Sequence, residues 1–193
     1  MSGVGPELAA IWAQAAGEVI GRDGGMPWHC PADFAFFRER TMGYPVIMGR
    51  ATWQSFPQRF RPLPGRTNIV LSRTVSPGEH DGARWVRDLP EALRVAAEAP
   101  SGSERIWLLG GASLYDRALG AEDLPVVRGG RVSRVLVTQL DAEVPGDARA
   151  PQLGPEWSVR ELGSGVDPKA RVAGPDGALS PAALPYRFLE ATR

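Results

Sequence analysis

Short apolar runs separated by turn residues recur along the chain, and their lengths are typical of buried strands. Longer stretches with one apolar face lie between them and are typical of helices. The expected strands cover residues 8–13, 46–48, 67–71, 84–86, 105–109 and 132–140. The expected helices cover residues 31–42, 50–56, 89–99 and, after a Gly-Gly pair, about 112–119. Strands that alternate with helices indicate an open, mainly parallel α/β sheet with flanking helices.

The C-terminal part of the chain follows a different pattern. Residues 157–162 and 186–191 alternate apolar and polar side chains, which predicts an antiparallel strand pair that closes the sheet. Residues 163–185 between them are rich in Gly and Pro, so we expect a long and poorly ordered excursion. The Gly-rich residues 18–27 are expected to form a mobile loop. Because no repeat or interdomain linker is visible, residues 1–193 are expected to form a single domain.

Composition and charge limit the class of protein. The chain has 193 residues with 22 basic and 22 acidic side chains, a balance unlike the basic surface of a nucleic-acid-binding protein. No apolar run approaches the ~18 residues of a membrane helix, and residues 1–7, an expected extension, lack the features of a secretory signal. One cysteine excludes an internal disulfide and fits a reducing compartment. We therefore expect a cytoplasmic protein that binds neither nucleic acid nor membranes.

Arginine, serine and glycine follow several expected strands, at the edge where open α/β sheets bind ligands. Arg50 begins a helix whose free N–H groups suit a phosphate. Ser72-Arg73 and Arg87 each follow another strand, and Gly110-Gly111 lets a ligand approach the backbone closely. Together these residues predict a polyphosphate ligand. The G-x-G-x-x-G and Walker A patterns are absent, so any dinucleotide must be bound by other means.

Asp33 is the strongest candidate for acid–base chemistry. It lies in the first turn of the expected helix at residues 31–42, close in sequence to Trp28 and beside the expected apolar face of Phe34, Phe37 and Met42. A carboxylate at this position often serves only the helix dipole. A carboxylate buried among aromatic rings would instead have a raised pKa that suits proton transfer. The sequence alone leaves both interpretations open.

The other candidate side chains carry less information. Two histidines and one cysteine lack the spacing of metal ligands, so no metal site is expected. His29 and His80 are interpreted as loop residues, and Cys30 as a structural residue. No serine lies in the G-x-S-x-G pattern of a nucleophile elbow, so covalent catalysis is not supported.

Several short motifs occur in an order that resembles bacterial dihydrofolate reductases, and actinobacterial ones in particular. The motifs are Met26-Pro27-Trp28, Pro31-Ala32-Asp33, Val46-Ile47-Met48-Gly49-Arg50, Leu63-Pro64-Gly65-Arg66, Leu71-Ser72-Arg73, Gly110-Gly111 and Asp141-Ala142-Glu143-Val144. The resemblance extends from about Leu8 to Arg193. It implies the dihydrofolate-reductase-like fold and the NADPH-dependent reduction of 7,8-dihydrofolate to 5,6,7,8-tetrahydrofolate. Hydride would go to C6 and a proton to N5, and the product would supply one-carbon metabolism.

The resemblance also implies roles for residues of the substrate site. Asp33 would hydrogen-bond the pterin amino group and N3, and Thr138 would reach Asp33 or that amino group. Trp28 would hold an ordered water, and water admitted near Met26 is a candidate proton donor to N5. Arg66 would pair with the glutamate carboxylate. The implied substrate contacts are Ile11, Trp12, Asp33, Phe34, Phe37, Phe56, Leu63, Arg66, Leu109 and Tyr115.

For the cofactor, the resemblance implies a larger set of residues. Several arginines near the adenosine ribose would favour NADPH over NADH, because NADPH carries a 2′-phosphate. In this family Gly110 and Gly111 are joined by a cis peptide bond. The implied NADPH contacts are Ala13, Ile20, Gly21, Gly49, Arg50, Ala51, Thr52, Leu71, Ser72, Arg73, Arg87, Gly110, Gly111, Ala112, Ser113, Leu114 and Tyr115.

Two alternatives to this reading remain. One is a pyrimidine reductase of riboflavin synthesis on the same fold, which would share the phosphate-binding edge. The other is a non-catalytic nucleotide-binding module. Asp33 together with Arg66 favours the folate substrate. The expected partners are therefore dihydrofolate and antifolate-type small molecules, and a monomer is the family expectation.

Overall fold

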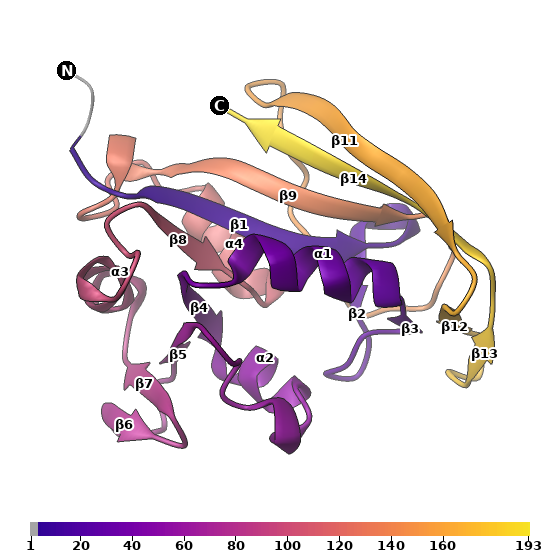
Figure 1. Cartoon of the computed structure of the whole chain (residues 1–193), viewed down its shortest axis with the longest axis horizontal. Helices are drawn as coiled ribbons and strands as arrows, with labels where there is room; N and C mark the ends of the chain where they lie inside the picture. The colour runs from indigo at the N-terminus through magenta and orange to yellow at the C-terminus, as the bar shows by residue number, and fades with distance from the viewer. Residues whose placement is uncertain (1–3) are drawn as a thin grey trace. The chain divides into compact units, whose positions relative to one another are not determined.

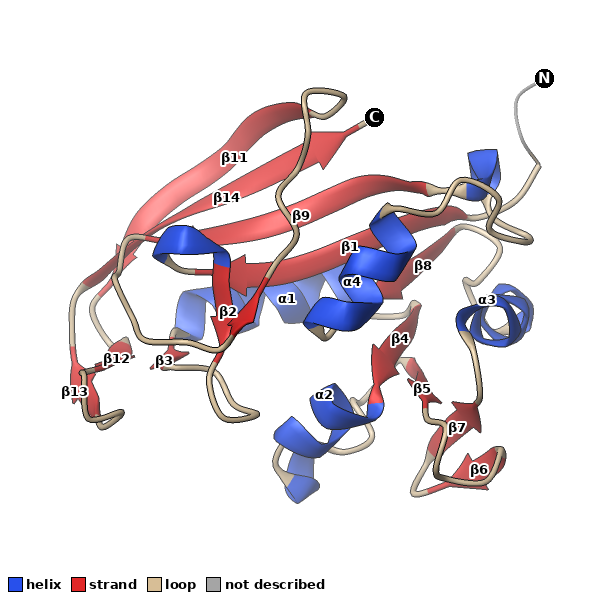
Figure 2. Ribbon diagram, turned by 180° about the vertical axis from the view of Figure 1, so that it is seen from behind, coloured by secondary structure: helices blue, strands red, loops and turns tan. Residues whose placement is uncertain are grey.

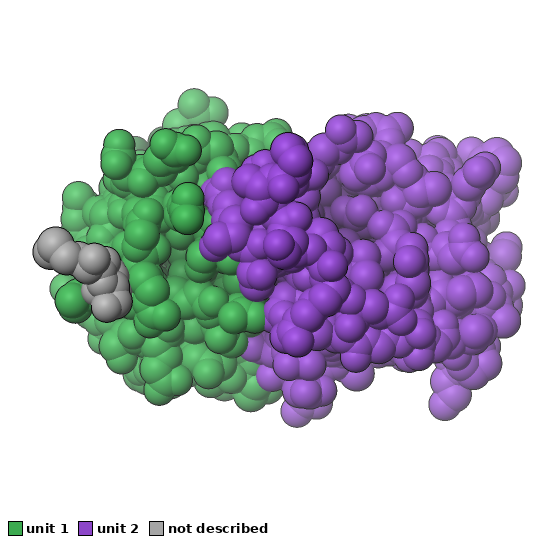
Figure 3. Space-filling model, turned by 90° about the horizontal axis from the view of Figure 1, so that it is seen from above, with its two compact units in different colours: residues 1–10, 41–134 green, residues 11–40, 135–193 purple. Residues whose placement is uncertain are grey.

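The computed structural model describes residues 4–193 and divides into two compact units, each assembled from two stretches of chain (Figures 1 and 3). Unit 1 takes residues 1–10 and 41–134, and unit 2 takes residues 11–40 and 135–193. The first three residues of the expected N-terminal extension lie outside the described residues. Two strands, β1 (Glu7–Gln14) and β9 (Val132–Leu140), contribute residues to both units. The expectation of a single domain stays a prediction.

The strands of unit 1 follow the order β1-β8-β4-β5-β7-β6. Their bounds are Arg105–Leu108 for β8, Pro45–Gly49 for β4, Thr67–Leu71 for β5, Ala83–Val86 for β7 and Gly78–His80 for β6. Every neighbouring pair from β1 to β7 is parallel, and only β6 pairs antiparallel. The expected mainly parallel sheet is confirmed. Strand β6 was missed because its three residues carry no apolar pattern.

Three helices belong to unit 1: α2 (Arg50–Ser55), α3 (Leu89–Glu98) and α4 (Ala112–Leu119). Helix α3 packs on β4, β5 and β8 through a buried face that includes Leu89 and Leu93. It begins where the carboxylate of Asp88 accepts a hydrogen bond from the backbone N–H of Glu91 at 2.8 Å. All three helices match the expected segments to within one or two residues. Short 3₁₀ turns cover Gln58–Phe60 and Arg128–Gly130.

The strands of unit 2 follow the order β11-β14-β9-β1, with β11 at Ser158–Asp167 and β14 at Leu184–Thr192. Strands β11 and β14 are antiparallel, which confirms the expected C-terminal pair. Helix α1 (Pro31–Thr41) buries Phe36, whose ring stacks on Phe188 of β14 at a centroid distance of 4.0 Å. The expected apolar face of α1 was therefore incorrect. Met42 is exposed, and the buried face includes a carboxylate, Asp33, which a hydrophobic pattern does not count.

Residues 163–185 differ most from the expectation (Figure 2). Strand β11 continues to Asp167, and the chain then forms a hairpin of β12 (Arg171–Ala173) and β13 (Leu179–Pro181). Strand β12 also pairs with β3 (Trp28–His29), so His29 lies in a strand rather than in a loop. The expected irregular excursion is thus corrected to regular structure. Gly and Pro weaken the local signal, and the pairing partner of β12 lies far away in the sequence.

The Gly-rich residues 18–27 are also partly regular. A 3₁₀ turn at Ala16–Glu18 leads into β2 (Val19–Gly21), which pairs antiparallel with β10 (Ala148–Arg149). The expected loop is therefore shorter than predicted. The second histidine, His80, ends β6 and is likewise part of a strand. Within residues 4–193, we find no helix that combines the length and the apolar character needed to cross a membrane.

Candidate active site

Asp33 is the third residue of α1, and only 7% of it is exposed. Burial raises its pKa to about 6, because the charged carboxylate loses solvation, and the hydroxyl of Thr138 opposes this rise only in part. Its burial and raised pKa favour the interpretation of Asp33 as a desolvated carboxylate over that of a simple partner of the helix dipole. A carboxyl with this pKa exchanges its proton close to neutral pH.

Two further polar groups of unit 2 are buried and make no hydrogen bond of normal geometry within the described residues. The Oγ1 of Thr138 on β9 and the Nε1 of Trp28 on β3 make no hydrogen bond of normal geometry to any residue among 4–193. Leaving such a group unpaired costs roughly 1–3 kcal/mol, so it usually has a water or ligand partner. Both groups were predicted site residues. These two atoms mark positions in unit 2 where a polar ligand or an ordered water would supply the missing hydrogen bond.

Cys30 precedes α1 and belongs to the buried cluster that also contains Trp28 and Leu140. Burial raises the pKa of its thiol to about 11, and the carboxylates of Asp33 and Asp167 add to the rise. The thiol therefore stays protonated at neutral pH and is a poor nucleophile. This agrees with the interpretation of Cys30 as a structural residue.

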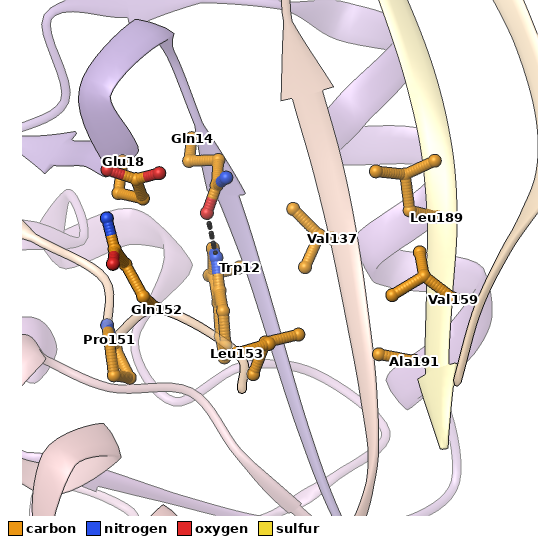
Figure 4. Close-up of a pocket in the computed structure, with 10 residues that line it drawn as sticks. All are labelled: Trp12, Gln14, Glu18, Val137, Pro151, Gln152, Leu153, Val159, Leu189 and Ala191. Carbon is orange, nitrogen blue, oxygen red and sulfur yellow. Dashed lines mark hydrogen bonds between the residues drawn. The ribbon is translucent and has the colours of Figure 1, made fainter. Parts of the chain in front are cut away.

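Trp12 lies on the opposite face of its strand from Ile11 and Ala13, because successive side chains of β1 alternate. Its indole N–H donates to Gln14 at 2.7 Å, and both side chains line a cavity of about 270 Å³ together with Val137 (Figure 4). The next residue of β9 is Thr138, which must therefore face the other way. The structure does not bring the indole of Trp12 together with Thr138 and Asp33, so only its backbone stays a candidate for substrate contact.

The remaining predicted residues of unit 2 lie in β1, β2, α1 and the segment before β3. Met26 is exposed and lines a second cavity, of about 370 Å³, with Arg22 and Pro27. Ile11 and Gly21 are buried. The half-buried residues are Ala13, Ile20, Phe34 and Phe37.

A residue outside the predicted set, Asp147, holds the segment that leads to Met26. Its carboxylate accepts a hydrogen bond from the N–H of Asp23 at 3.0 Å. Its own N–H donates to the carbonyl of Gly21 at 3.0 Å. These bonds extend the pairing of β2 with β10. The acidic stretch around residue 147 was visible in the sequence, but its partner lies 124 residues away.

The strand ends of unit 1 that were predicted to bind phosphate lie at one edge of the sheet. The register aligns Gly49 at the end of β4 with Leu71 of β5, and Leu71 with Val86 of β7. Residues that follow these strand ends therefore lie at one edge of the sheet. They are Arg50, Ala51, Thr52, Ser72, Arg73 and Arg87.

The arginines at this edge carry positive charge that no acidic side chain among residues 4–193 neutralises. Arg50 donates to the hydroxyl of Thr74 at 2.8 Å, and Arg87 donates to the carbonyl of Arg73 at 3.3 Å. None of these three guanidinium groups pairs with a carboxylate within residues 4–193. Exposed guanidinium groups without acidic partners favour an anionic ligand.

Gly110 and Gly111 connect β8 to α4 through a cis peptide bond, as the family resemblance implied. Gly110 has φ +96°, and a Cβ there would lie 2.8 Å from the ring of Tyr115, so only glycine fits. Its carbonyl accepts a hydrogen bond from the N–H of Gly49 at 2.7 Å, which joins this turn to the end of β4. No side chain caps α4, whose first residues are Ala112, Ser113 and Leu114. The N–H of Leu114 donates to the carbonyl of Gly111 at 2.9 Å, so within residues 4–193 the N–H groups of Ala112 and Ser113 are the ones open to a ligand.

Hydrogen bonds within unit 1 orient the guanidinium of Arg66. Its Nε donates to the carbonyl of Pro64 at 3.1 Å, and its Nη1 donates to the hydroxyl of Thr41 at 3.0 Å. Asn68, which is outside the predicted site residues, accepts a hydrogen bond from the N–H of Leu63 and donates one to its carbonyl, each at 3.0 Å. The amide of Asn68 thus orders the turn that presents Leu63 and Arg66. The other predicted substrate residues of unit 1 are Phe56, which is half-buried, and the buried Leu109 and Tyr115.

Comparison with known proteins gives one consistent result. The sequence profile of the family described as dihydrofolate reductase matches residues 7–171. A dihydrofolate reductase of Mycobacterium tuberculosis is 43% identical over 153 residues, which cover 78% of this chain and 83% of the relative. That of Mycobacterium leprae is 41% identical over 153 residues, covering 78% and 84%. That of Haemophilus influenzae is 40% identical over 153 residues, covering 79% and 84%.

Proposed function

The chain belongs to the dihydrofolate reductase family, and we propose that it reduces 7,8-dihydrofolate to 5,6,7,8-tetrahydrofolate with NADPH as hydride donor. The observation that carries this proposal is Asp33, a buried carboxyl with a pKa of about 6 beside the unpaired hydroxyl of Thr138. A pterin ring offers an amino group and an N3–H to such a pair. The product would supply one-carbon metabolism.

On the substrate side, the ionised carboxylate of Asp33 accepts hydrogen bonds from the pterin amino group and N3. The hydroxyl of Thr138 accepts from the same amino group, which completes its hydrogen bonding. Trp28 holds an ordered water through its unpaired indole N–H. Water that enters beside the exposed Met26 protonates N5, while Asp33 polarises the ring rather than touching N5. The proton transfer is therefore expected to depend on the ionisation of Asp33.

Arg66 binds the glutamate carboxylate of the substrate. Its guanidinium is oriented by Thr41 and Pro64, and a pre-oriented planar fork loses little freedom when it forms a bidentate pair. Phe37, Phe56 and Leu63 supply apolar surface for the pterin and benzoyl rings. Antifolates that mimic these groups would compete for the same residues.

The residues of unit 1 fit a dinucleotide phosphate. In the described part of the chain, Arg50, Arg73 and Arg87 lack acidic partners, and Gly110-Gly111 leaves room for close approach to the backbone. Two or more arginines at one edge favour the 2′-phosphate that distinguishes NADPH from NADH. When bound, the cofactor supplies a hydride from its C4. Ala13 and Ile20 would contact its carboxamide, and the ring of Tyr115 would lie near the nicotinamide.

We also propose that the protein is a cytoplasmic monomer. The single cysteine is buried and stays protonated, which suits a reducing compartment. Sedimentation or gel filtration at micromolar concentration checks the oligomeric state, and a dimer would contradict it.

The test of function is consumption of NADPH on addition of dihydrofolate, with NADH in a parallel reaction. A matched pair of variants separates the two ligands. Arg66→Ala is expected to raise KM for dihydrofolate about 10- to 100-fold, because it removes a charged hydrogen-bonded pair, and to change KM for NADPH less than about twofold. Arg50→Ala is expected to do the reverse, with a rise of about tenfold for NADPH. Turnover of a ribosylaminopyrimidine but not of dihydrofolate would contradict the proposal.

A further inference from the structure

Asp167 ends β11 and lies against the start of α1, although no step of the reduction uses it. It is buried, and its Oδ2 accepts a hydrogen bond from the backbone N–H of Ala32 at 2.7 Å. The thiol of Cys30 lies 3.7 Å from the same oxygen, and the N–H of Lys169 donates to Oδ1 at 2.9 Å. Ala32 directly precedes Asp33. A carboxylate 135 residues away in the sequence therefore holds the backbone beside the proposed catalytic carboxyl.

The hydrogen bond from Ala32 to Asp167 satisfies a backbone N–H that has no acceptor within the helix. The first N–H groups of a helix have no partner within it, and Ala32 is the second residue of α1. Pro31 has no N–H, and the N–H of Phe34 donates to the carbonyl of Cys30 at 3.1 Å. The carboxylate of Asp167 supplies the acceptor for Ala32, and its negative charge is favourable at the positive end of the helix. Asp167 thus caps α1 from a distant strand.

The charge on Asp167 is stable at neutral pH. Burial raises the pKa of this carboxyl, but the hydrogen bonds from Ala32 and Lys169 outweigh burial and leave the pKa below its ordinary value. The thiol of Cys30 and the nearby His29 act in the same direction. The cap is therefore a permanent anion rather than a group that titrates with Asp33.

The chain after Asp167 strengthens the same contact. Strand β12 pairs with β3, with Arg171 opposite His29 and Val172 opposite Trp28. The N–H of Ala173 also donates to the carbonyl of Pro27 at 2.9 Å. Residues 167–173 therefore bond residues 27–32 at several points. The family profile ends at residue 171, so most of the β12–β13 hairpin lies outside the matched region.

We propose that Asp167 is a positioning residue for the reduction, which it serves by capping α1 and fixing the backbone that presents Asp33. The inference rests on the proposed function for its effect on turnover, but not for its effect on Asp33 itself. Loss of the cap would free the N–H of Ala32 and loosen the first turn of α1, and water would then reach Asp33. A displacement of about 1 Å at a reacting group can cost about 100-fold in rate.

The experiment compares Asp167→Ala with Asp176→Ala, a matched control in the turn of the β12–β13 hairpin that follows Asp167. Asp176 also accepts a backbone hydrogen bond, from Ala178 at 3.1 Å, but in an exposed turn. Asp167→Ala is expected to lower kcat/KM for dihydrofolate about tenfold or more and to change KM for NADPH less than about twofold. Asp176→Ala is expected to leave both unchanged. A parallel loss for both ligands, in step with the folded fraction, would overturn the positioning role.

A second readout follows Asp33 directly, by the NMR titration of its carboxyl carbon in the ligand-free protein. In Asp167→Ala the midpoint is expected to fall from about 6 towards the ordinary value of 3.8, because Asp33 becomes better solvated. Asp167→Asn keeps an acceptor oxygen, so it is expected to restore part of the midpoint and of kcat/KM. It also carries the test if Asp167→Ala does not fold.

The two readouts separate the possible failures. If both Asp167 variants are folded and leave the midpoint of Asp33 and kcat/KM unchanged, the positioning role is wrong. If the wild-type protein does not reduce dihydrofolate, the proposed function is wrong, and the titration of Asp33 still decides whether Asp167 positions it.

Discussion

Asp33 and Asp167 are two buried aspartates of unit 2 that lie beside the same helix start, yet their chemistry differs. Their exposed fractions are 7% and 5%. The pKa of Asp33 is raised to about 6 by burial, whereas the pKa of Asp167 falls below its ordinary value. Asp167 accepts hydrogen bonds from two backbone N–H groups. For Asp33, the hydroxyl of Thr138 lowers the pKa, but by less than burial raises it. A low exposed fraction alone therefore does not make a reactive carboxyl, and the depth of burial and the number of donors together set the pKa.

The same difference has opposite consequences for stability. The native state holds the proton of Asp33 more tightly than the unfolded state does, so stability falls as pH rises from about 4 to about 6. The native state holds the proton of Asp167 less tightly, so its contribution is present above its unfolded pKa and is lost as pH falls through the native value. The buried carboxylate of Asp33 therefore lowers the stability of the protein at neutral pH, a cost that is common at functional sites.

The largest expected effect is on activity. Asp33→Asn should retain NADPH binding but lower kcat for dihydrofolate reduction by about 100-fold or more at neutral pH, because the amide cannot carry the charge that polarises the pterin. Asp167→Asn should lower it only about threefold, because an acceptor for Ala32 remains. Steady-state kinetics with both variants give the comparison. Unchanged turnover in Asp33→Asn would show that the charge of Asp33 is not needed to polarise the pterin.

The next effect is on the free energy of unfolding. At neutral pH, Asp33→Asn should raise it by about 1–3 kcal/mol, since a shift of one pKa unit corresponds to about 1.4 kcal/mol. The gain should vanish near pH 4, below which the wild-type carboxyl is protonated in both states. Asp167→Asn should lower the free energy of unfolding by about 1 kcal/mol. Urea titrations at several pH values measure both changes, and changes of the same sign would contradict the comparison.

The smallest effect concerns Thr138. Thr138→Val removes the hydroxyl that lowers the pKa of Asp33, so the midpoint of the Asp33 titration should move above about 6. Turnover at neutral pH should fall by less than about tenfold, because a larger share of Asp33 is then protonated. The pH profile of kcat/KM reports the shift. A downward shift would mean that Thr138 opposes the charged form, contrary to the structure.

The sequence predicted unit 1 better than the segments around α1. In unit 1, apolar runs and the residues directly after them were sufficient, because parallel strands bring their carboxyl ends to one edge. Arg50, Arg73 and Arg87 were found in this way. Around α1 the partners are distant: Asp167 bonds Ala32, and β12 pairs with β3. Trp12 shows a related limit, because a motif names a residue without stating which face of the strand its side chain takes.

By itself, the sequence determined the family, the parallel order of alternating strands and helices, and the identity of Asp33 as the candidate carboxyl. These follow from local patterns and motif order, which do not depend on distant contacts. Only the tertiary structure decided that Asp33 is desolvated and that Asp167 is not reactive. The pKa of a buried carboxyl depends on which donors surround it, and those donors come from segments that meet only after folding.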